Sequence, residues 1–150
     1  MRFTIDDAPQ RSQAWFAARA GRLTGSMAHV ITAQGKGSAE AVTRRDYRLQ
    51  LVCERLTGQP QDDGNGFVNA AMQRGIDLEP QAFAAYEATT GNLALKTGFL
   101  VHTEHLAGCS LDGHVQDFAG IVEIKCPKSA THLRYLRQGI VPADYMPQIT

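Results

Sequence analysis

Three charged residues in the last third of the chain have the types and spacing for metal-assisted chemistry. Glu123 and Lys125 lie two residues apart in the apolar stretch GIVEIKC, and Asp112 precedes them in SLDG. Side chains alternate across a strand, so a strand here puts Glu123 and Lys125 on one face and its apolar residues on the other. If the preceding strand pairs with it, Asp112 reaches the same region. Two carboxylates and a lysine suit metal-assisted phosphodiester hydrolysis, because carboxylates bind Mg²⁺ and lysine can orient or deprotonate a water.

A simpler interpretation exists for the same residues, namely a hairpin on which Glu123 and Lys125 form a solvated ion pair of little energetic value. A further carboxylate bears on the choice. Glu79 falls within the apolar stripe of a predicted helix, three residues after Ile76 and four before Phe83. A buried carboxylate costs free energy unless it is paired, hydrogen-bonded or metal-bound. The alternative is a partly exposed glutamate at a helix kink.

The elements that must position these residues can be predicted from apolar periodicity and turn residues. The first predicted helix covers residues 13–20 after a Ser12 cap, and the second begins at a cap formed by Thr24 or Ser26. A third helix is predicted over 41–57 and a fourth over 67–90. Pro80 either kinks the fourth helix or starts a separate one. Apolar runs at 93–102, 105–115 and 120–126 then predict three hairpin-connected antiparallel strands. A helix over 130–138, capped by Ser129, and the start of another complete the chain. This mixture predicts an α/β (α+β) fold.

Composition limits the class of protein. With 150 residues and 43% hydrophobic content, the chain suits one domain over residues 1–150. Fifteen basic and fifteen acidic side chains cancel, which neither supports nor excludes a nucleic-acid partner. Three cysteines without a CxxC pair are typical of reduced thiols in a cytosolic protein. The sequence contains no membrane-spanning run and no signal peptide, so we expect a soluble intracellular protein.

Four blocks of sequence carry a resemblance to a known family. They are W-x(3)-R-x-GRLTGS at residues 15–26, RGIDLEP-x(5)-YEATTG at 74–91, SLDG-x(9)-EIKCP at 110–127, and IVPADYMPQI at 140–149. In this order they resemble the PD-(D/E)-x-K nucleases, in the form found in the YqaJ-like viral recombinase family of the phage lambda exonuclease type. The resemblance implies a restriction-endonuclease-like core, with a central mixed β-sheet flanked by helices.

The resemblance also implies roles for the charged residues. Asp112 and Glu123 match the metal-binding carboxylates, joined by the main-chain carbonyl of Ile124. Lys125 matches the catalytic lysine near the attacking water. Glu79 matches a helix glutamate that completes the active site, through water or at a second metal. This role would explain a carboxylate within an apolar stripe.

A second set of residues matches positions that bind DNA in this family. Those near the phosphate at the 5′ end are Arg19, Thr24, Ser26 and Ser110. An arginine offers a bidentate donor fork, and hydroxyl groups complete an anion pocket. Gln148 corresponds to a glutamine on the helix that borders the metal site.

Two other groups of residues leave alternatives open. Arg134 and Arg137, on the late predicted helix, could contact a DNA backbone or form a solvated helix face. Trp15 and Phe16 are expected to anchor the core rather than to stack on a base.

By this resemblance we expect the chain to be a Mg²⁺-dependent deoxyribonuclease, with Mn²⁺ as a substitute. It would digest one strand of duplex DNA from its 5′ end in phage-type recombination, leaving a 3′ single strand for an annealing protein. Processive members of the family form ring-shaped homotrimers around DNA, and the expected location is the cytoplasm of a bacterial host. The alternatives are an endonuclease or single-strand-preferring nuclease of the same fold, or a non-catalytic DNA-end-binding fragment.

Two departures from the family pattern bear on these expectations. Leu111 stands where the family commonly has proline, which loosens the turn before Asp112. Relatives continue for several tens of residues beyond Gln148, so we expect a truncated form or a fragment.

Overall fold

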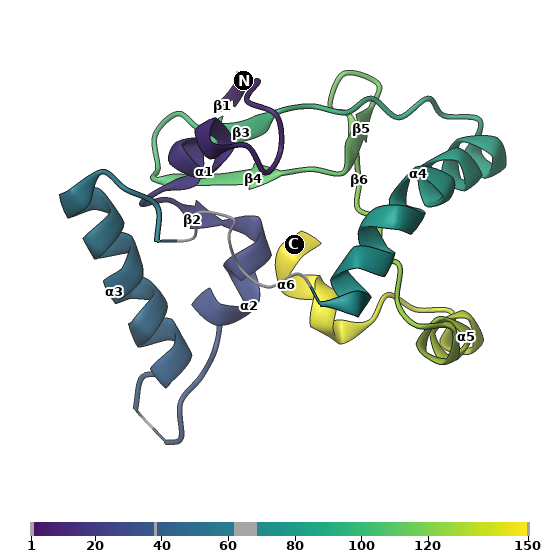
Figure 1. The fold of residues 1–150 in the computed structure, drawn as a ribbon. Coiled ribbons are helices and arrows are strands. Elements are labelled where there is room, and N and C mark those ends of the chain that lie inside the picture. Colours follow the sequence, from purple (N-terminus) through teal and green to yellow (C-terminus); the bar gives the residue numbers. More distant parts are fainter. Residues whose placement is uncertain (1, 38, 62–68, 150) are drawn as a thin grey trace. The chain divides into compact units, whose positions relative to one another are not determined.

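The computed structural model describes residues 2–37, 39–61 and 69–149. The chain divides into two compact units, each made of helices and short strands (Figure 1). The first unit comprises Met1–Asn65, Gly98–Ser110 and Ala143–Thr150, and the second comprises Gly66–Thr97 and Leu111–Pro142. The predicted α+β class, with a mixed sheet flanked by helices, is confirmed. A single domain over residues 1–150 stays a prediction.

The sheet of the first unit has four strands in the order β1-β3-β4-β2. They are β1 (Phe3–Asp6), β3 (Phe99–His102), β4 (Ala107–Ser110) and β2 (Leu23–Thr24). The β3–β4 hairpin is antiparallel, as predicted, and β1 pairs antiparallel to β3. Strand β2 runs parallel to β4, which makes the sheet mixed. The sequence interpretation missed β1 and β2.

Two longer helices of the first unit start and stop close to the predicted residues. Helix α1 (Gln13–Arg19) begins at Ser12, whose hydroxyl accepts a hydrogen bond from the Trp15 backbone N–H at 3.2 Å. Helix α3 (Val42–Thr57) ends at Gly58, which adopts a left-handed φ of 66°. Trp15 and Phe16 form a buried cluster with Phe99 of β3, which confirms them as core anchors.

Short helical segments complete the first unit. They are η1 (Gly25–Met27), α2 (Ala28–Ile31), η2 (Ala143–Tyr145) and α6 (Met146–Ile149). Thr24 precedes η1, but its side chain makes no capping hydrogen bond within the described residues, and α2 follows Met27 rather than Ser26. The predicted hydroxyl cap is therefore wrong, because the Thr24 hydroxyl faces Ser26 and Tyr47 instead.

The second unit contains helix α4 (Ala70–Thr90), the antiparallel hairpin β5 (Gly113–Val115) and β6 (Gly120–Val122), and helix α5 (Ser129–Gln138). The prediction that α4 starts at residue 67 lies outside the described residues, and its described part begins after an Asn69 cap. Pro80 starts no second helix, since α4 runs continuously through it. Phe83 of α4 packs against Val122 of β6 and against Ala94.

Three predicted details of the second unit are wrong. The run over residues 105–115 does not form one strand, because it divides into β4 and β5, which belong to different sheets. The strand predicted over 120–126 stops at Val122. The residue before α5 is Lys128 rather than Ser129, and among the described residues its side chain makes no capping hydrogen bond.

In the part of the chain that the structure describes, no helix has both the length and the apolar character to cross a bilayer. None of the three cysteines, all of which are described, forms a disulfide.

Candidate active site

The segment that follows β6 is held by a side chain rather than by a neighbouring strand. The Ile124 N–H donates a hydrogen bond to Asp112 Oδ2 at 2.6 Å. An N–H bonded to this carboxylate does not enter a strand ladder, which explains why β6 ends at Val122. Asp112 therefore fixes the backbone between Glu123 and Lys125.

Glu123 and Lys125 form an ion pair with each other, as their predicted position on one face requires. Their side chains are 17% and 35% exposed, respectively. Glu123 is therefore partly buried, whereas Lys125 lies at the exposed side of the pair. Ile124, between them, packs against the apolar cluster of Phe83 and Val122 and supports the segment from the other side.

The third carboxylate, Glu79, projects from α4. Its Oε1 accepts a hydrogen bond from Lys96 Nζ at 2.8 Å, and its side chain is 26% exposed. The apolar stripe therefore tolerates Glu79 because it is partly exposed and paired. Helix α4 also lies close to β5, since a Cβ on Gly113 would stand 2.6 Å from Phe83 Cζ. Gly113, directly after Asp112, is the residue that permits this approach.

Burial and the neighbouring charged groups together raise the pKa of Asp112. Burial desolvates the carboxylate and raises its pKa, whereas the hydrogen bond from Ile124 lowers it. The negative charge of Glu123 raises the pKa, the positive charge of Lys125 lowers it, and the charge of Glu79 raises it. Asp112 thus lies within electrostatic reach of the three other residues that the sequence predicted for the active site.

The chemistry of this donor set fits a divalent cation. Carboxylate oxygens are hard ligands, and a cation would compensate the like charges that raise the pKa of Asp112. As arranged here, no three His, Cys, Asp or Glu side chains among the described residues stand close enough to enclose a metal ion. Glu123 and Glu79 are each turned toward a lysine. We infer that, to bind a metal ion, these carboxylates must give up their ion pairs with lysine and turn to the cation. The role of the Ile124 carbonyl as a ligand stays a prediction.

In the first unit, the four residues predicted to bind a phosphate are linked through Trp15. Trp15 Nε1 donates to Ser110 Oγ at 3.0 Å, and the Arg19 guanidinium lies over the Trp15 ring, 4.1 Å from its centroid. Arg19 Nη2 donates to Ser26 Oγ at 3.4 Å. Ser26 Oγ in turn lies 3.3 Å from Thr24 Oγ1. The guanidinium of Arg19 and the hydroxyl groups of Ser26 and Thr24 are therefore adjacent, and the Ser110 hydroxyl joins them through Trp15. We call these four residues the anion pocket, because their donor groups suit a phosphate.

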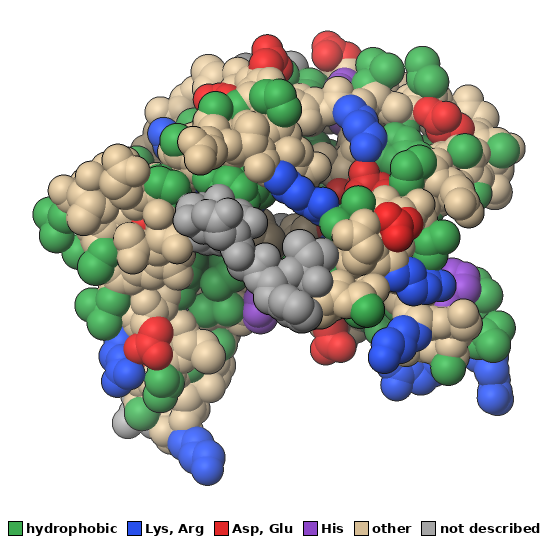
Figure 2. All heavy atoms as spheres, viewed as in Figure 1, with side chains coloured by type: hydrophobic (Ala, Val, Ile, Leu, Met, Phe, Trp, Pro, Cys, Tyr) green, Lys and Arg blue, Asp and Glu red, His purple; other side chains and the backbone are tan. Residues whose placement is uncertain are grey.

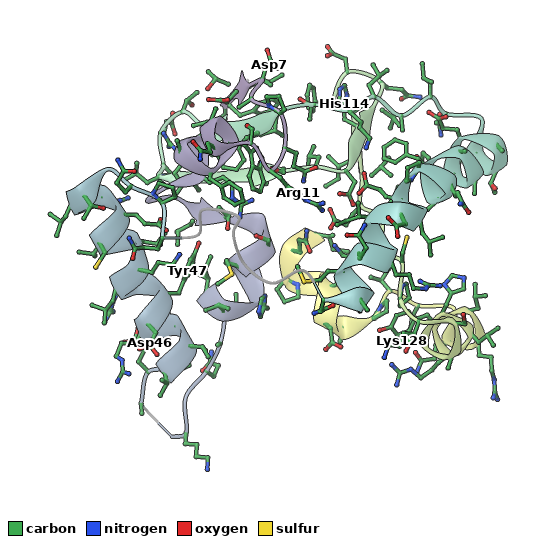
Figure 3. All side chains as sticks on the ribbon, in the orientation of Figure 1. Asp7, Arg11, Asp46, Tyr47, His114 and Lys128 are labelled. Carbon is green, nitrogen blue, oxygen red and sulfur yellow. The ribbon has the colours of Figure 1, made fainter. Side chains whose placement is uncertain are left out.

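Helix α3 supports this pocket with residues that the sequence interpretation did not assign to a site. Tyr47, labelled in Figure 3, accepts a hydrogen bond from the Thr24 N–H at 3.3 Å and donates one to the Arg22 carbonyl at 3.3 Å. Glu54 is only 5% exposed, and its Oε2 accepts a hydrogen bond from the Gly21 N–H at 2.7 Å. Both side chains hold the loop that joins Arg19 to Thr24. A glutamate in a charged helix gave no signal of this role.

Gln148 lies on α6, which contacts η1, the segment that contains Ser26. Gln148 therefore belongs to the first unit together with the anion pocket. The four predicted active-site residues belong to the second unit.

Comparisons with known proteins point to one family. The family model of the YqaJ-like viral recombinase domain matches residues 14–150. A crystal structure of LHK-Exo, an alkaline exonuclease from Laribacter hongkongensis, is 37% identical in sequence, with a TM-score of 0.75 over 91% of this chain. The structure of LHK-Exo in complex with dAMP is likewise 37% identical, with a TM-score of 0.76 over 92%. The chain spans 64% and 65% of the length of those two structures, respectively. No curated protein matches it.

Proposed function

The chain belongs to the YqaJ-like viral recombinase domain family, and on this premise we propose that it is a metal-dependent DNA exonuclease. The observation that carries the proposal is geometric: Asp112 binds the N–H of Ile124, between the paired side chains of Glu123 and Lys125, and Glu79 belongs to the same unit. The likeness to an alkaline exonuclease supports it. The proposed substrate is the 5′ end of linear duplex DNA, and the proposed cofactor is Mg²⁺, which Mn²⁺ can replace.

Each residue of this group would have its own role in hydrolysis. Asp112 and Glu123, with the Ile124 carbonyl, would hold the cation, which supplies Lewis-acid chemistry at the scissile phosphate. Lys125 would orient the attacking water through Nζ and stabilise the negative charge that develops on the phosphate oxygens. Glu79 would complete the site through water or at a second cation. Asp112 would also keep Lys125 in place, because it holds the N–H of the preceding residue.

The anion pocket would select the 5′-terminal phosphate. The Arg19 guanidinium supplies charge and directional donors, and Thr24, Ser26 and Ser110 supply hydroxyl groups. This chemistry suits a phosphate monoester better than a hydroxyl terminus, because the monoester carries more charge and more acceptor oxygens. We therefore expect DNA with a 5′-phosphate to be the preferred substrate.

The test is digestion of three DNA substrates with Mg²⁺: a linear duplex with 5′-phosphate, the same duplex with 5′-hydroxyl, and a closed circle. We expect mononucleotides from the 5′-phosphorylated duplex first, and an intact circle. Cutting of the circle would overturn the exonuclease proposal in favour of an endonuclease. Binding of linear DNA without digestion, in either Mg²⁺ or Mn²⁺, would identify a non-catalytic end binder.

A matched pair of variants tests the role of the anion pocket. Arg19→Gln removes the guanidinium of the pocket, whereas Arg45→Gln removes one that pairs with Asp46 on the exposed side of α3. We expect Arg19→Gln to abolish the preference for 5′-phosphate and Arg45→Gln to keep it. An unchanged preference in Arg19→Gln removes Arg19 from end recognition.

The family resemblance extends the proposal to assembly. A homotrimer around DNA and an annealing protein that receives the 3′ strand are the proposed partners, and a bacterial cytoplasm is the proposed location. Light scattering of the chain with and without duplex DNA tests the trimer.

A further inference from the structure

We propose that Arg74 is a positioning residue that holds the Lys125 segment against helix α4. The inference rests on the proposed function, and it adds a residue that acts through the backbone of the segment that carries Lys125. Arg74 Nη1 donates hydrogen bonds to the Cys126 carbonyl at 3.1 Å and to the Pro127 carbonyl at 3.0 Å. These are the two residues that directly follow Lys125.

The segment needs such an anchor because no strand supports it. In the described chain, β6 ends at Val122 and α5 begins at Ser129. Two side chains bind the backbone between these elements. Asp112 accepts the hydrogen bond from the Ile124 N–H, and Arg74 donates to the carbonyls of Cys126 and Pro127. Lys125 lies between the two anchors, so loss of either would release one side of it.

The position of Arg74 also sets the relation between two parts of the active site. Arg74 and Glu79 belong to the same helix, α4, and Lys125 belongs to the segment that Arg74 holds. The arginine therefore fixes the segment that carries Glu123 and Lys125 relative to the helix that carries Glu79. Helix α4 itself is anchored on β6 through Phe83 and Val122, so Arg74 pulls the segment toward a supported element.

The chemistry of arginine suits this role. One guanidinium nitrogen carries two hydrogen atoms, so Nη1 can serve two carbonyl groups while the planar group stays in one orientation. Arg74 is half-buried and makes no ion pair among the residues that the structure describes. Its donors are therefore directed to backbone carbonyls rather than to a carboxylate. A lysine at position 74 would be shorter and would lack the fixed fork.

The first experiment measures local protection without DNA or metal. Hydrogen exchange is followed by NMR for the amides of Ile124 and Lys125 in the unaltered chain and in Arg74→Ala. We expect faster exchange of these two amides in Arg74→Ala, with the β5–β6 hairpin unchanged. Unchanged exchange at both amides overturns the proposal. Faster exchange throughout the second unit also overturns it, because Arg74 would then stabilise the unit as a whole.

The second experiment measures catalysis and its chemical rescue. At saturating Mg²⁺ and DNA, we expect Arg74→Ala to lower kcat about 100-fold, the loss that a misplacement near 1 Å can cause, with KM for DNA nearly unchanged. Added guanidinium ion should restore part of kcat in Arg74→Ala. Arg45→Ala, on the exposed side of α3, serves as the control and should neither lose activity nor respond to guanidinium.

The two experiments separate failure of this proposal from failure of the proposed function. If the unaltered chain does not digest DNA while Arg74→Ala loosens only the Lys125 segment, the positioning role stands and the exonuclease proposal fails. If the unaltered chain digests DNA and Arg74→Ala keeps its kcat, the positioning role fails. A fall in kcat without guanidinium rescue, accompanied by a lower melting temperature, would assign Arg74 a purely structural role.

Discussion

Glu54 provides a sharp test of how α3 supports the anion pocket. Its carboxylate is 5% exposed and accepts three hydrogen bonds: from the Gly21 N–H at 2.7 Å, from Gln50 Nε2 at 2.9 Å, and from the Gln61 N–H at 3.1 Å. Neighbouring Arg55 donates from Nε to the Gly21 carbonyl at 3.0 Å. Gly21 has a left-handed φ of 68°, and a Cβ there would lie 2.6 Å from Arg55 Cγ. The loop between α1 and β2 is thus bound to α3 through both the N–H and the carbonyl of one residue, Gly21.

The magnitude follows from what Glu54→Ala removes. An unsatisfied buried N–H at Gly21 costs about 1–3 kcal/mol, and the one lost methylene group costs about 0.8 kcal/mol. Relief of carboxylate desolvation offsets part of this cost. We expect a net loss of about 2 kcal/mol, equivalent to roughly 4–8 °C in melting temperature. Glu54→Gln keeps one oxygen acceptor but turns an N–H₂ group toward a donor, so it should cost about half as much.

The assay is thermal or urea unfolding followed by the fluorescence of Trp15, the single tryptophan, which belongs to the same unit as Glu54. Glu40→Gln is the control, because its carboxylate pairs with Arg44 and Arg48 at the surface and should contribute at most about 1 kcal/mol. Glu54→Ala should also weaken the preference for 5′-phosphate. A loss no greater than that of Glu40→Gln would refute the reasoning.

Three further predictions concern the charged groups of both units. The pKa of Asp112 is raised, chiefly by burial, so the folded chain keeps this proton to a higher pH than the unfolded chain and ionisation of Asp112 costs stability. Asp112→Asn should therefore raise the melting temperature of the EDTA-treated chain at pH 7. This gain in melting temperature should disappear when the pH falls below 3.8, the ordinary pKa of aspartate. A gain that does not change with pH would contradict the prediction. Because the Arg19 guanidinium lies over the Trp15 ring, a 5′-phosphorylated oligonucleotide should change the emission of Trp15 more than the 5′-hydroxyl form does; equal changes would count against the pocket. Basic side chains gather over α5 (Figure 2). Arg134→Gln and Arg137→Gln should each reduce the slope of log K against log[salt] for binding to duplex DNA by about 0.9. An unchanged slope would mean that these arginines contact no phosphate.

The sequence predicted the arrangement of Glu123 and Lys125 better than the backbone that carries them. Alternation correctly put Glu123 and Lys125 on one side, because an extended segment keeps that periodicity even outside a sheet. The strand itself was predicted too long, because the Asp112 side chain takes the Ile124 N–H that a ladder would need. Local periodicity does not report this competition between a side chain and a neighbouring strand.

The remaining misses share one cause, namely contacts between distant parts of the chain. Strand β1 pairs with β3, about a hundred residues later, and β2 has only two residues, so neither has a strong local pattern. Arg74 bonds to carbonyl groups more than fifty residues away, which no side-chain pattern can indicate. The Thr24 hydroxyl was predicted to cap a helix, and it instead meets Tyr47 of α3. Residues that support a site from another element are found only from the structure.

The central claim is that Asp112, Glu123 and Lys125 form a metal-dependent centre that hydrolyses DNA. The most direct test is the rate of nucleotide release from 5′-phosphorylated duplex DNA as Mg²⁺ is increased, for the unaltered chain, Lys125→Ala and Lys128→Ala. Lys128 is an exposed lysine three residues further on and serves as the matched control. We predict a rate that depends on Mg²⁺, a loss of at least about 100-fold in Lys125→Ala at saturating Mg²⁺, and no change in Lys128→Ala. Cleavage without a divalent cation, or an unchanged rate in Lys125→Ala, would contradict the claim.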